Sequence, residues 1–187
     1  TIDSVLPPIS GVADVAIDFA AAYSRTIDVL LARGRTRIAI VSRHFHHARE
    51  MHWPENKFTP TMQAMAERGI YPVASGDAQV FMTPLELLDW CKKHPKKIDA
   101  VLCENDLVAA EVVAEMAQRG MKTPDDILVV GCDGNCLVRG IWSHRIDTKW
   151  IAAEAVRLLQ RLMAGETRIE RSVYCPVLID DENQPVE

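Results

Sequence analysis

Short apolar runs alternate with longer segments of helical periodicity through the middle of the chain. Runs rich in Val, Ile and Leu lie at 37–42, 99–103 and 127–131, and each predicts a strand that is buried on both faces. The run 71–75 is a weaker strand candidate because it contains a proline, and a closing strand is expected at 172–179. Strands that alternate with helices predict a doubly wound α/β fold with a parallel sheet and right-handed crossovers.

The sequence also marks where the helices begin and end. Asp18 is the expected N-cap of a helix that Gly34 stops. Thr83-Pro84-Leu85-Glu86 has the form of a capping box, with the proline in the first turn. Asn105 or Asp106 opens another helix, which runs to Gly120. Two further helices are expected, at 58–68 and 151–163.

In sheets of this type, small ligands lie beyond the carboxyl ends of the strands. The loops expected there are 43–56, 76–82, 104–106 and 132–145. Asp133 could accept hydrogen bonds from a ligand's hydroxyl or amine groups, although a turn-forming aspartate would also suit this position. Trp53 and Trp142 could stack on a ligand ring or pack between elements. The candidate ligand contacts in these loops are Arg43, Trp53, Asn105, Asp106, Asp133 and Trp142.

Two features suggest catalysis or metal binding, but each has a simpler interpretation. The loop 42–53 holds four of the six histidines, which with Glu50 could bind a metal. Its spacing matches no standard zinc pattern, so a polar pocket wall or a solvated loop is favoured. Cys132 directly follows a buried strand, which favours a structural thiol over a nucleophile. No Gly-rich phosphate loop, nucleophile elbow or HExxH pair is found. We therefore predict no enzyme activity, no cofactor and no metal.

The overall composition is that of a globular protein: 48% of the 187 residues are hydrophobic and 25% are charged. The net charge of −5 and the lack of a basic block make this segment alone a poor candidate for binding DNA. No apolar run approaches the roughly 18 residues that span a bilayer, and the start has no signal-peptide pattern. Five cysteines without framework spacing favour free thiols in a reducing cytosol, so a cytoplasmic location is expected.

Several motifs occur in a characteristic order along the chain. They include Val15-Ala16-Ile17-Asp18-Phe19, Gly34-Arg35-Thr36-Arg37-Ile38-Ala39, Ala100-Val101-Leu102-Cys103-Glu104-Asn105-Asp106 and Thr123-Pro124-Asp125-Asp126-Ile127-Leu128-Val129-Val130-Gly131-Cys132-Asp133. The last two follow the patterns A-V-x-x-x-N-D and V-P-x-D-I-S-V-V-G-Y-D. In this order, the chain resembles the effector domain of the LacI/GalR family of bacterial transcription repressors, over nearly its whole length.

This resemblance implies a two-lobed, periplasmic-binding-protein-like fold in which a small effector, a sugar or a related metabolite, closes the cleft between the lobes. It also implies a homodimer that binds operator DNA through a helix-turn-helix headpiece. Asp133, Asn105 and Asp106 match family pocket positions. Lys57 stands where the family normally has Arg, and a lysine is a point donor that does not replace the bidentate guanidinium. Cys132 replaces the family tyrosine, and 143–148 replaces its Pro-Leu-Thr-Thr stretch, so the ligand class stays open.

Measured against the family, the chain is expected to lack the headpiece and the first strand–helix units of the first lobe. The expected division is part of the first lobe at 1–34, the effector-binding second lobe at 35–148, and a helix and strand returning to the first lobe at 149–187. A regulator's sensing domain is the favoured function. The alternatives are a periplasmic solute-binding protein, which a signal peptide would distinguish, and an α/β enzyme that uses the histidine-rich loop.

Overall fold

The computed structural model describes residues 12–44, 57–70, 80–135, 138–167 and 169–187. Its main body is a six-stranded sheet with the order β3-β2-β4-β5-β6-β8. All neighbouring strands pair in parallel except β6 and β8, which pair antiparallel, so an antiparallel strand closes one edge. The strands are β2 (Ile38–Val41), β3 (Val80–Phe81), β4 (Ala100–Cys103), β5 (Leu128–Asp133), β6 (Ile141–Arg145) and β8 (Val177–Ile179). The predicted α/β fold class is confirmed.

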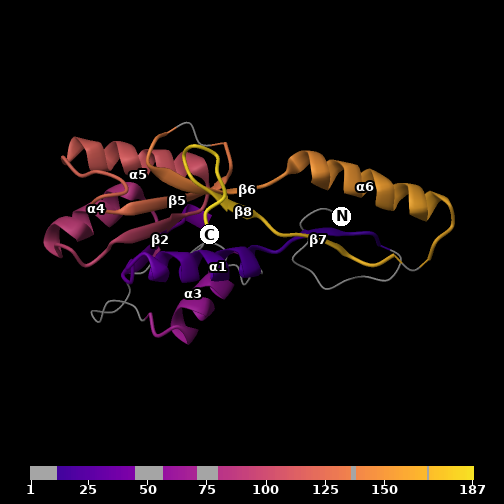
Figure 1. The fold of residues 1–187 in the computed structure, drawn as a ribbon, viewed down its shortest axis with the longest axis horizontal. Coiled ribbons are helices and arrows are strands. Elements are labelled where there is room, and N and C mark those ends of the chain that lie inside the picture. Colours follow the sequence, from indigo (N-terminus) through magenta and orange to yellow (C-terminus); the bar gives the residue numbers. More distant parts are fainter. Residues whose placement is uncertain (1–11, 45–56, 71–79, 136–137, 168) are drawn as a thin grey trace.

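Helices cover both faces of this sheet (Figure 1). One face packs against α1 (Phe19–Ala32) and α3 (Phe58–Glu67), and its core includes Tyr23, Ile27 and Met65. The other face packs against α4 (Pro84–Lys93) and α5 (Asp106–Gln118), with Leu87 and Val112 in its core. Strands β2 and β4 are buried along their whole length because both of their faces are covered.

The helix caps follow the sequence signals. Asp18 caps α1 by accepting a hydrogen bond from Ala21 N–H at 2.9 Å. Thr83 and Glu86 form the expected capping box at the start of α4. Asn105, one of the two candidates, is the N-cap of α5. Its Oδ1 accepts from Val108 N–H at 2.9 Å, and Asp106 is the first helical residue.

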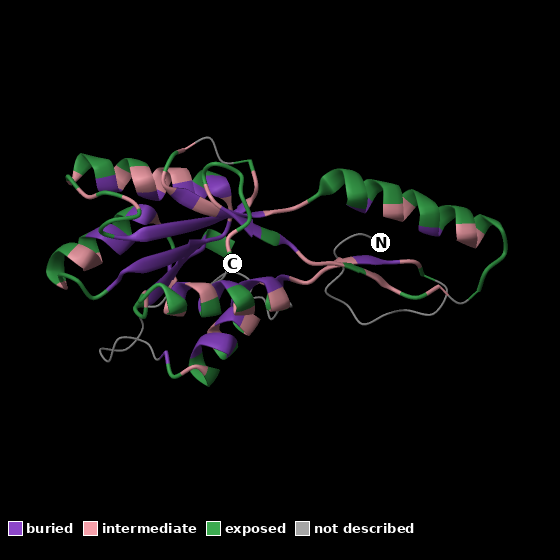
Figure 2. Ribbon diagram, viewed as in Figure 1, coloured by how far each residue is buried: buried purple, intermediate pink, exposed green. Residues whose placement is uncertain are grey.

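A second, smaller unit lies beside the six-stranded sheet (Figure 1). It consists of the parallel pair β1 (Val15–Ile17) and β7 (Ser172–Tyr174) and the helix α6 (Thr148–Met163). Its small core contains Val15, Ile151 and Leu158. Most of α6 is exposed (Figure 2), including several apolar side chains on its surface: Val156, Leu159 and Met163.

The chain crosses between the two sheets at three places, and Tyr174 contacts all of them. Its carbonyl accepts from Asp18 N–H at 2.8 Å, in the connection from β1 to α1. Its hydroxyl accepts from Asp147 N–H at 3.0 Å and donates to the Arg145 carbonyl at 3.2 Å, in the connection from β6 to α6. The third crossing follows Tyr174 itself, at 175–176. One side chain and its backbone therefore join the three connections.

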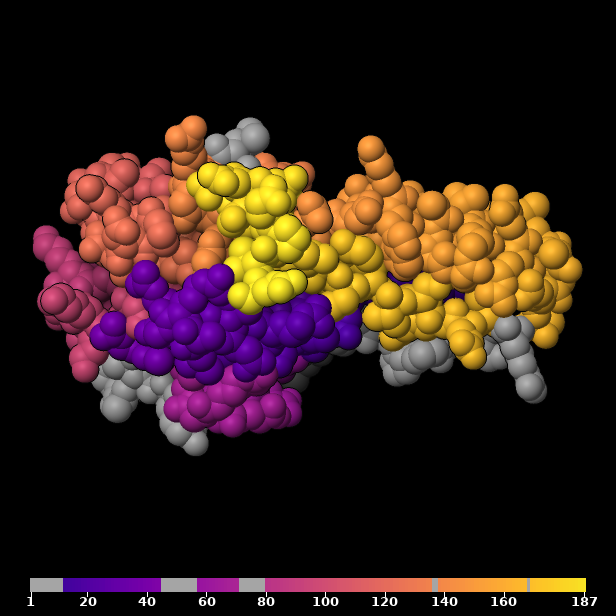
Figure 3. Space-filling model, in the orientation of Figure 1, coloured from indigo at the N-terminus to yellow at the C-terminus, as the bar shows by residue number. Residues whose placement is uncertain are grey.

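Two predictions about strands are corrected. The closing segment 172–179 forms two strands in different sheets, because Pro176 has no N–H for a ladder and the chain crosses there. The segment 141–145, expected as part of a loop, is strand β6. After β8, the C-terminal residues lie against α1 (Figure 3), where an Arg33 guanidinium N–H donates to the Glu187 carbonyl at 3.2 Å.

Other expectations stay untested. The strand candidate at 71–75 lies outside the described residues. The division into 1–34, 35–148 and 149–187 stays a prediction, and α1 packs on the six-stranded sheet. None of the described helices is long and apolar enough to cross a membrane.

Candidate ligand site

A cavity of about 270 Å³ lies at the carboxyl edge of the six-stranded sheet. Its walls come from the residues that follow β2 and β4, from the end of β5 and from the start of α3. The lining residues are Ser42, His44, Lys57, Phe58, Glu104, Asn105 and Asp133. This is the edge where a doubly wound sheet is expected to bind a ligand, and three of the predicted contacts, Lys57, Asn105 and Asp133, meet there.

Asp133 ends β5 with a φ of 116°, in the left-handed region that non-glycine residues rarely adopt. Gly134 continues the turn, and a Cβ there would lie 2.8 Å from the Arg145 Cα on β6. Burial raises the pKa of the Asp133 carboxyl, and the charge of nearby Lys57 partly offsets that rise. The unusual backbone therefore places a half-buried carboxyl at the cavity wall.

Lys57 immediately precedes α3 and also lines the cavity. Its ammonium donates to the Glu104 carbonyl oxygen at 3.1 Å and lies 3.6 Å from Cys132 Sγ. It also lies 4.6 Å from the centre of the Phe19 ring, a cation–π distance. The single cation of the described lining is thus held against a carbonyl, a thiol and an aromatic face.

Glu104 is the functional candidate that was missing from the predicted contacts. Its side chain is buried, and its Oε2 atom accepts from the Ser42 hydroxyl at 2.9 Å and from His44 N–H at 3.3 Å. The His44 ring nitrogen Nδ1 is 3.1 Å from the same oxygen. The sequence does contain a signal for Glu104, namely its position. An acidic residue between a buried strand and a helix N-cap lies at the edge of the sheet where ligands bind.

Asp106 has a structural role instead of lining the cavity. Its Oδ1 accepts from the buried Ser143 hydroxyl at 2.6 Å, and its Oδ2 accepts from Asn135 N–H at 2.7 Å. Burial raises the pKa of its carboxyl, while the Ser143 and Asn135 hydrogen bonds act in the opposite direction. Gly131 leaves space for this carboxylate, because a Cβ there would lie 2.1 Å from Oδ1. Asp106 therefore ties α5 to the turn after β5.

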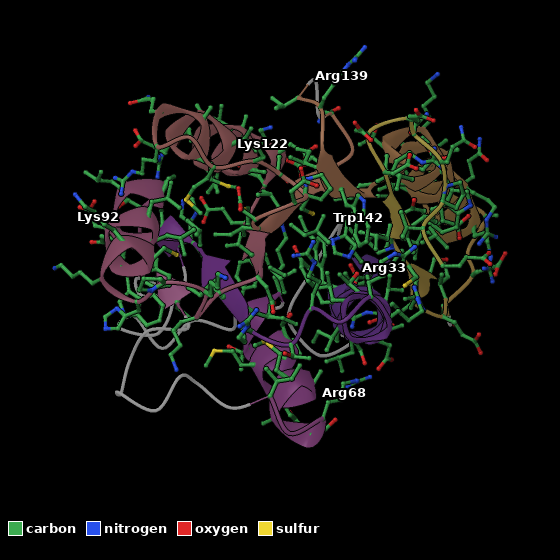
Figure 4. The ribbon with its side chains drawn as sticks, turned by 60° about the vertical axis from the view of Figure 1, so that its left-hand side comes forward. Arg33, Arg68, Lys92, Lys122, Arg139 and Trp142 are labelled. Carbon is green, nitrogen blue, oxygen red and sulfur yellow. The ribbon has the colours of Figure 1, made fainter. Side chains whose placement is uncertain are left out.

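Arg43 and Trp142 do not line this cavity either. Arg43 forms an ion pair with Glu111 on α5 at 2.5 Å. Trp142 is directed toward Arg33 of α1 (Figure 4), whose guanidinium carbon lies 4.9 Å from the centre of the indole ring. Side chains of a strand alternate between the two faces of its sheet, so the face that Trp142 occupies is set by its place in β6. Because residue 142 was expected in a loop, this face could not be predicted from the sequence. Trp53 lies outside the described residues.

The core beside the site holds a histidine and a thiol. His144 on β6 pairs in register with Cys132 on β5, and both are fully buried. Burial raises the pKa of the Cys132 thiol to about 11, and the charge of Lys57 opposes that rise. A protonated, inaccessible thiol is a poor nucleophile, which agrees with the structural interpretation of Cys132.

Metal binding finds no support in the part of the chain that the structure describes. There, no three or more His, Cys, Asp or Glu side chains are arranged to hold an ion. Most of the histidine-rich loop, 45–56, lies outside that part.

A second cavity of about 660 Å³ lies at the opposite edge of the sheet, between the C-terminal ends of α4 and α5. The cavity at the carboxyl edge combines two carboxyl groups, a lysine and an asparagine, a set suited to binding hydroxyl and amine groups.

Comparison with known proteins agrees with this geometry. Residues 27–180 match the family described as "Periplasmic binding protein-like domain". The chain belongs to this family. The match spans the six strands of the main sheet, so the periplasmic binding protein-like domain includes every described wall of the cavity.

Two curated relatives of this periplasmic binding protein-like domain are transcription regulators. The chain is 29% identical over 75 residues to the HTH-type transcriptional regulator GntR of Escherichia coli (strain K12), which covers 39% of this chain and 23% of the relative. It is 32% identical over 108 residues to the HTH-type transcriptional repressor PurR of Vibrio campbellii, which covers 56% of this chain and 31% of the relative. The chain spans less than a third of the length of either relative.

Solved structures share the fold. A LacI family transcriptional regulator from Arthrobacter sp. FB24 in complex with lactose superposes with a TM-score of 0.77 at 20% identity, covering 100% of this chain and 70% of that chain. A CelR–cellobiose complex gives a TM-score of 0.71 at 19% identity, covering 97% and 57%. At these identities the likeness shows the fold alone. The resemblance that the sequence motifs suggested is confirmed for family and fold.

Proposed function

We propose that this chain is the effector-sensing part of a LacI-type bacterial transcription regulator. The observation that carries the proposal is the cavity where Lys57, Glu104, Asn105 and Asp133 converge at the carboxyl edge of the sheet. Its polar lining suits a small hydroxyl- or amine-bearing metabolite, and the curated relatives are regulators. Operator DNA is bound by a helix-turn-helix headpiece outside this sequence. The domain acts in the cytoplasm and has no catalytic role.

Sensing requires that the effector prefer one arrangement of the two sheets over another. A ligand with equal affinity for both arrangements would shift no population, however tightly it bound. The cavity lies at the edge of the larger sheet, and the connections through Tyr174 lead from that sheet to β1, β7 and α6. Binding there changes the balance between open and closed arrangements, and this change alters operator affinity.

A homodimer completes the proposal. Large apolar side chains are exposed at and just before the N-terminal ends of α4 and α5: Met82, Leu85 and Leu107, the last with 68% of its surface exposed. Large apolar side chains exposed on a surface mark candidate interaction sites. Leu107→Asp should shift the protein from dimer to monomer in sedimentation equilibrium, whereas Leu107→Met, which keeps an apolar side chain there, should leave the dimer intact.

The proposal is tested with the full-length protein. Thermal unfolding is measured in the presence of sugars, amino sugars, nucleosides and amino acids, and any stabilising compound is added to an operator-binding titration. We expect at least one compound to raise the unfolding temperature and to change operator affinity. Asp133→Asn should weaken both effects, since it removes a charged hydrogen-bond acceptor from the cavity.

Absence of both operator binding and ligand stabilisation would refute the proposal. A ligand that binds without any effect on DNA would favour the solute-binding alternative. Turnover of a ligand that is abolished by Asp133→Asn would favour the enzyme alternative. The curated relatives, both transcription regulators, support the first function over these two.

A further inference from the structure

Glu104 has an oxygen atom that the described structure does not use. Only 7% of the residue is exposed. The Ser42 hydroxyl, the His44 N–H and the His44 ring nitrogen all meet its Oε2 atom. No hydrogen bond from a described residue reaches Oε1, and Glu104 lines the cavity. A buried carboxylate with one occupied and one free oxygen is a preformed acceptor for a ligand donor.

The charges around the cavity are unbalanced among the described residues. Glu104 and Asp133 contribute two carboxyl groups, while Lys57 contributes one ammonium. That ammonium donates to the backbone carbonyl of Glu104. The His44 ring, 3.1 Å from Glu104 Oε2, adds a positive charge only when it is protonated. Arg43, the nearest arginine in sequence, forms its ion pair with Glu111 instead.

We infer that the effector carries a protonated amine, which binds the Glu104 carboxylate next to hydroxyl groups that reach Asp133 and Asn105. The inference rests on the proposed function and names the ligand class of the same site. When the cleft closes over a ligand, water leaves the cavity, and a carboxylate without a counter-charge becomes costly to bury. A ligand ammonium supplies that charge, with N–H groups that Oε1 can accept.

An effector with a carboxylate or phosphate at this position is disfavoured by the same geometry. It would place a third negative group beside Glu104 and Asp133, against one lysine that already donates to a carbonyl. A neutral sugar would bind the same acceptors but would leave one negative charge without a partner. The expected order of affinity is therefore amine, then neutral parent, then acid.

The test uses the full-length protein and matched probe sets that share a carbon skeleton. Glucosamine, glucose and gluconate form one set, galactosamine, galactose and galactonate a second, and an aminodeoxyribonucleoside with its parent nucleoside a third. Dissociation constants are measured by calorimetry at pH 7. We expect the amine of the best-binding set to bind about tenfold to a hundredfold tighter than its neutral parent, in line with the strength of charged hydrogen bonds.

Variants test whether Glu104 is responsible for the preference for the amine. Glu104→Gln keeps the shape and the Ser42 contact but removes the charge, so it should reduce the amine's affinity about tenfold or more and leave the parent's nearly unchanged. Glu104→Asp keeps the charge and should retain a preference for the amine. Glu115→Gln, which removes an acidic group from α5 far from the cavity lining, is the matched control and should change neither affinity. Equal urea midpoints would show that each variant still folds.

Each outcome decides the inference. Tighter binding of a neutral or acidic member, or an amine preference that Glu104→Gln leaves intact, overturns it while the proposed function stands. Lack of binding by every probe, together with lack of operator binding, overturns both. An amine preference that is lost in Glu104→Gln and kept in Glu115→Gln supports it.

Discussion

His144 gives the fold a pH dependence that its surroundings allow us to work out. The ring is fully buried, 4.3 Å from the centre of the Tyr23 ring, and its Nε2 lies 2.8 Å from the Thr26 hydroxyl oxygen. That hydroxyl donates its one proton to the Ala22 carbonyl at 3.1 Å. With the hydroxyl proton on that carbonyl, the consistent tautomer has the ring proton on Nε2, donating to Thr26. Nδ1, which is buried and has no hydrogen-bond partner among the described residues, is left unprotonated.

Protonation of the ring would bury a charge, so burial lowers the pKa of His144 to about 4. In the unfolded chain the histidine has an ordinary pKa of about 6.5. Its folded pKa is thus depressed, and the unfolded state binds more protons between these two values. The contribution of neutral His144 to the free energy of unfolding is complete above pH 6.5 and is lost as the pH falls toward 4. For this shift, linkage gives a loss of about 2 kcal/mol between pH 7 and pH 5, and about 3 kcal/mol at completion.

The measurement compares urea unfolding at pH 7 and pH 5 for the wild type and for His144→Gln. Glutamine keeps a donor for Thr26 but does not titrate. Each protein is compared with itself, so the variant's own loss of packing cancels, as do the carboxylates common to both proteins. The wild type should lose about 2 kcal/mol more than the variant over this range.

Equal losses in the two proteins would refute the reasoning. So would an NMR titration in which the His144 ring protonates near pH 6.5 in the folded state. The control is His94→Gln, since His94 lies in the α4–β4 connection, far along the chain from this core, with its ring stacked on Trp90. That variant should keep the full pH dependence of the wild type.

Three further substitutions have expected outcomes. Asp106→Ala should lower the free energy of unfolding by about 3 kcal/mol in urea titrations, since the buried Ser143 hydroxyl and the Asn135 N–H lose a charged acceptor. An unchanged value would show that Asp106 is dispensable. Gly131→Ala should destabilise the fold and weaken effector binding in calorimetry, because its Cβ would meet Asp106 Oδ1 at 2.1 Å; wild-type affinity would contradict this. Thr83→Ala should cost about 1 kcal/mol in thermal unfolding by removing the α4 cap, and Thr83→Ser should restore most of it.

The sequence predicted those parts of the fold whose signals are local. Continuous apolar runs identified β2, β4 and β5, since strands covered on both faces have no polar side. Cap residues located the starts of α1, α4 and α5 within a residue, because a cap is defined by hydrogen bonds only a few positions apart.

Tertiary contacts decided the rest. Strand β6 contains Ser143, His144 and Arg145, whose polar character predicted a loop, but Ser143 and His144 are buried because Asp106 and Thr26 provide partners from distant elements. The same contacts explain the site. Asp133, Asn105 and Lys57 were identified by family position, whereas Glu104 joined the candidate contacts when the structure placed it in the cavity lining.

Tyr174 has a further consequence for how the two sheets can move. Tyr174 is hydrogen-bonded to the connection from β1 to α1 and to the connection from β6 to α6, and it begins the connection from β7 to β8. The three connections therefore meet at one hinge point. Segments joined at one point can bend together, but they cannot slide independently. We therefore expect motion of β1, β7 and α6 relative to the larger sheet to be a rotation about Tyr174, in which small displacements near this residue become large ones at the far end of α6.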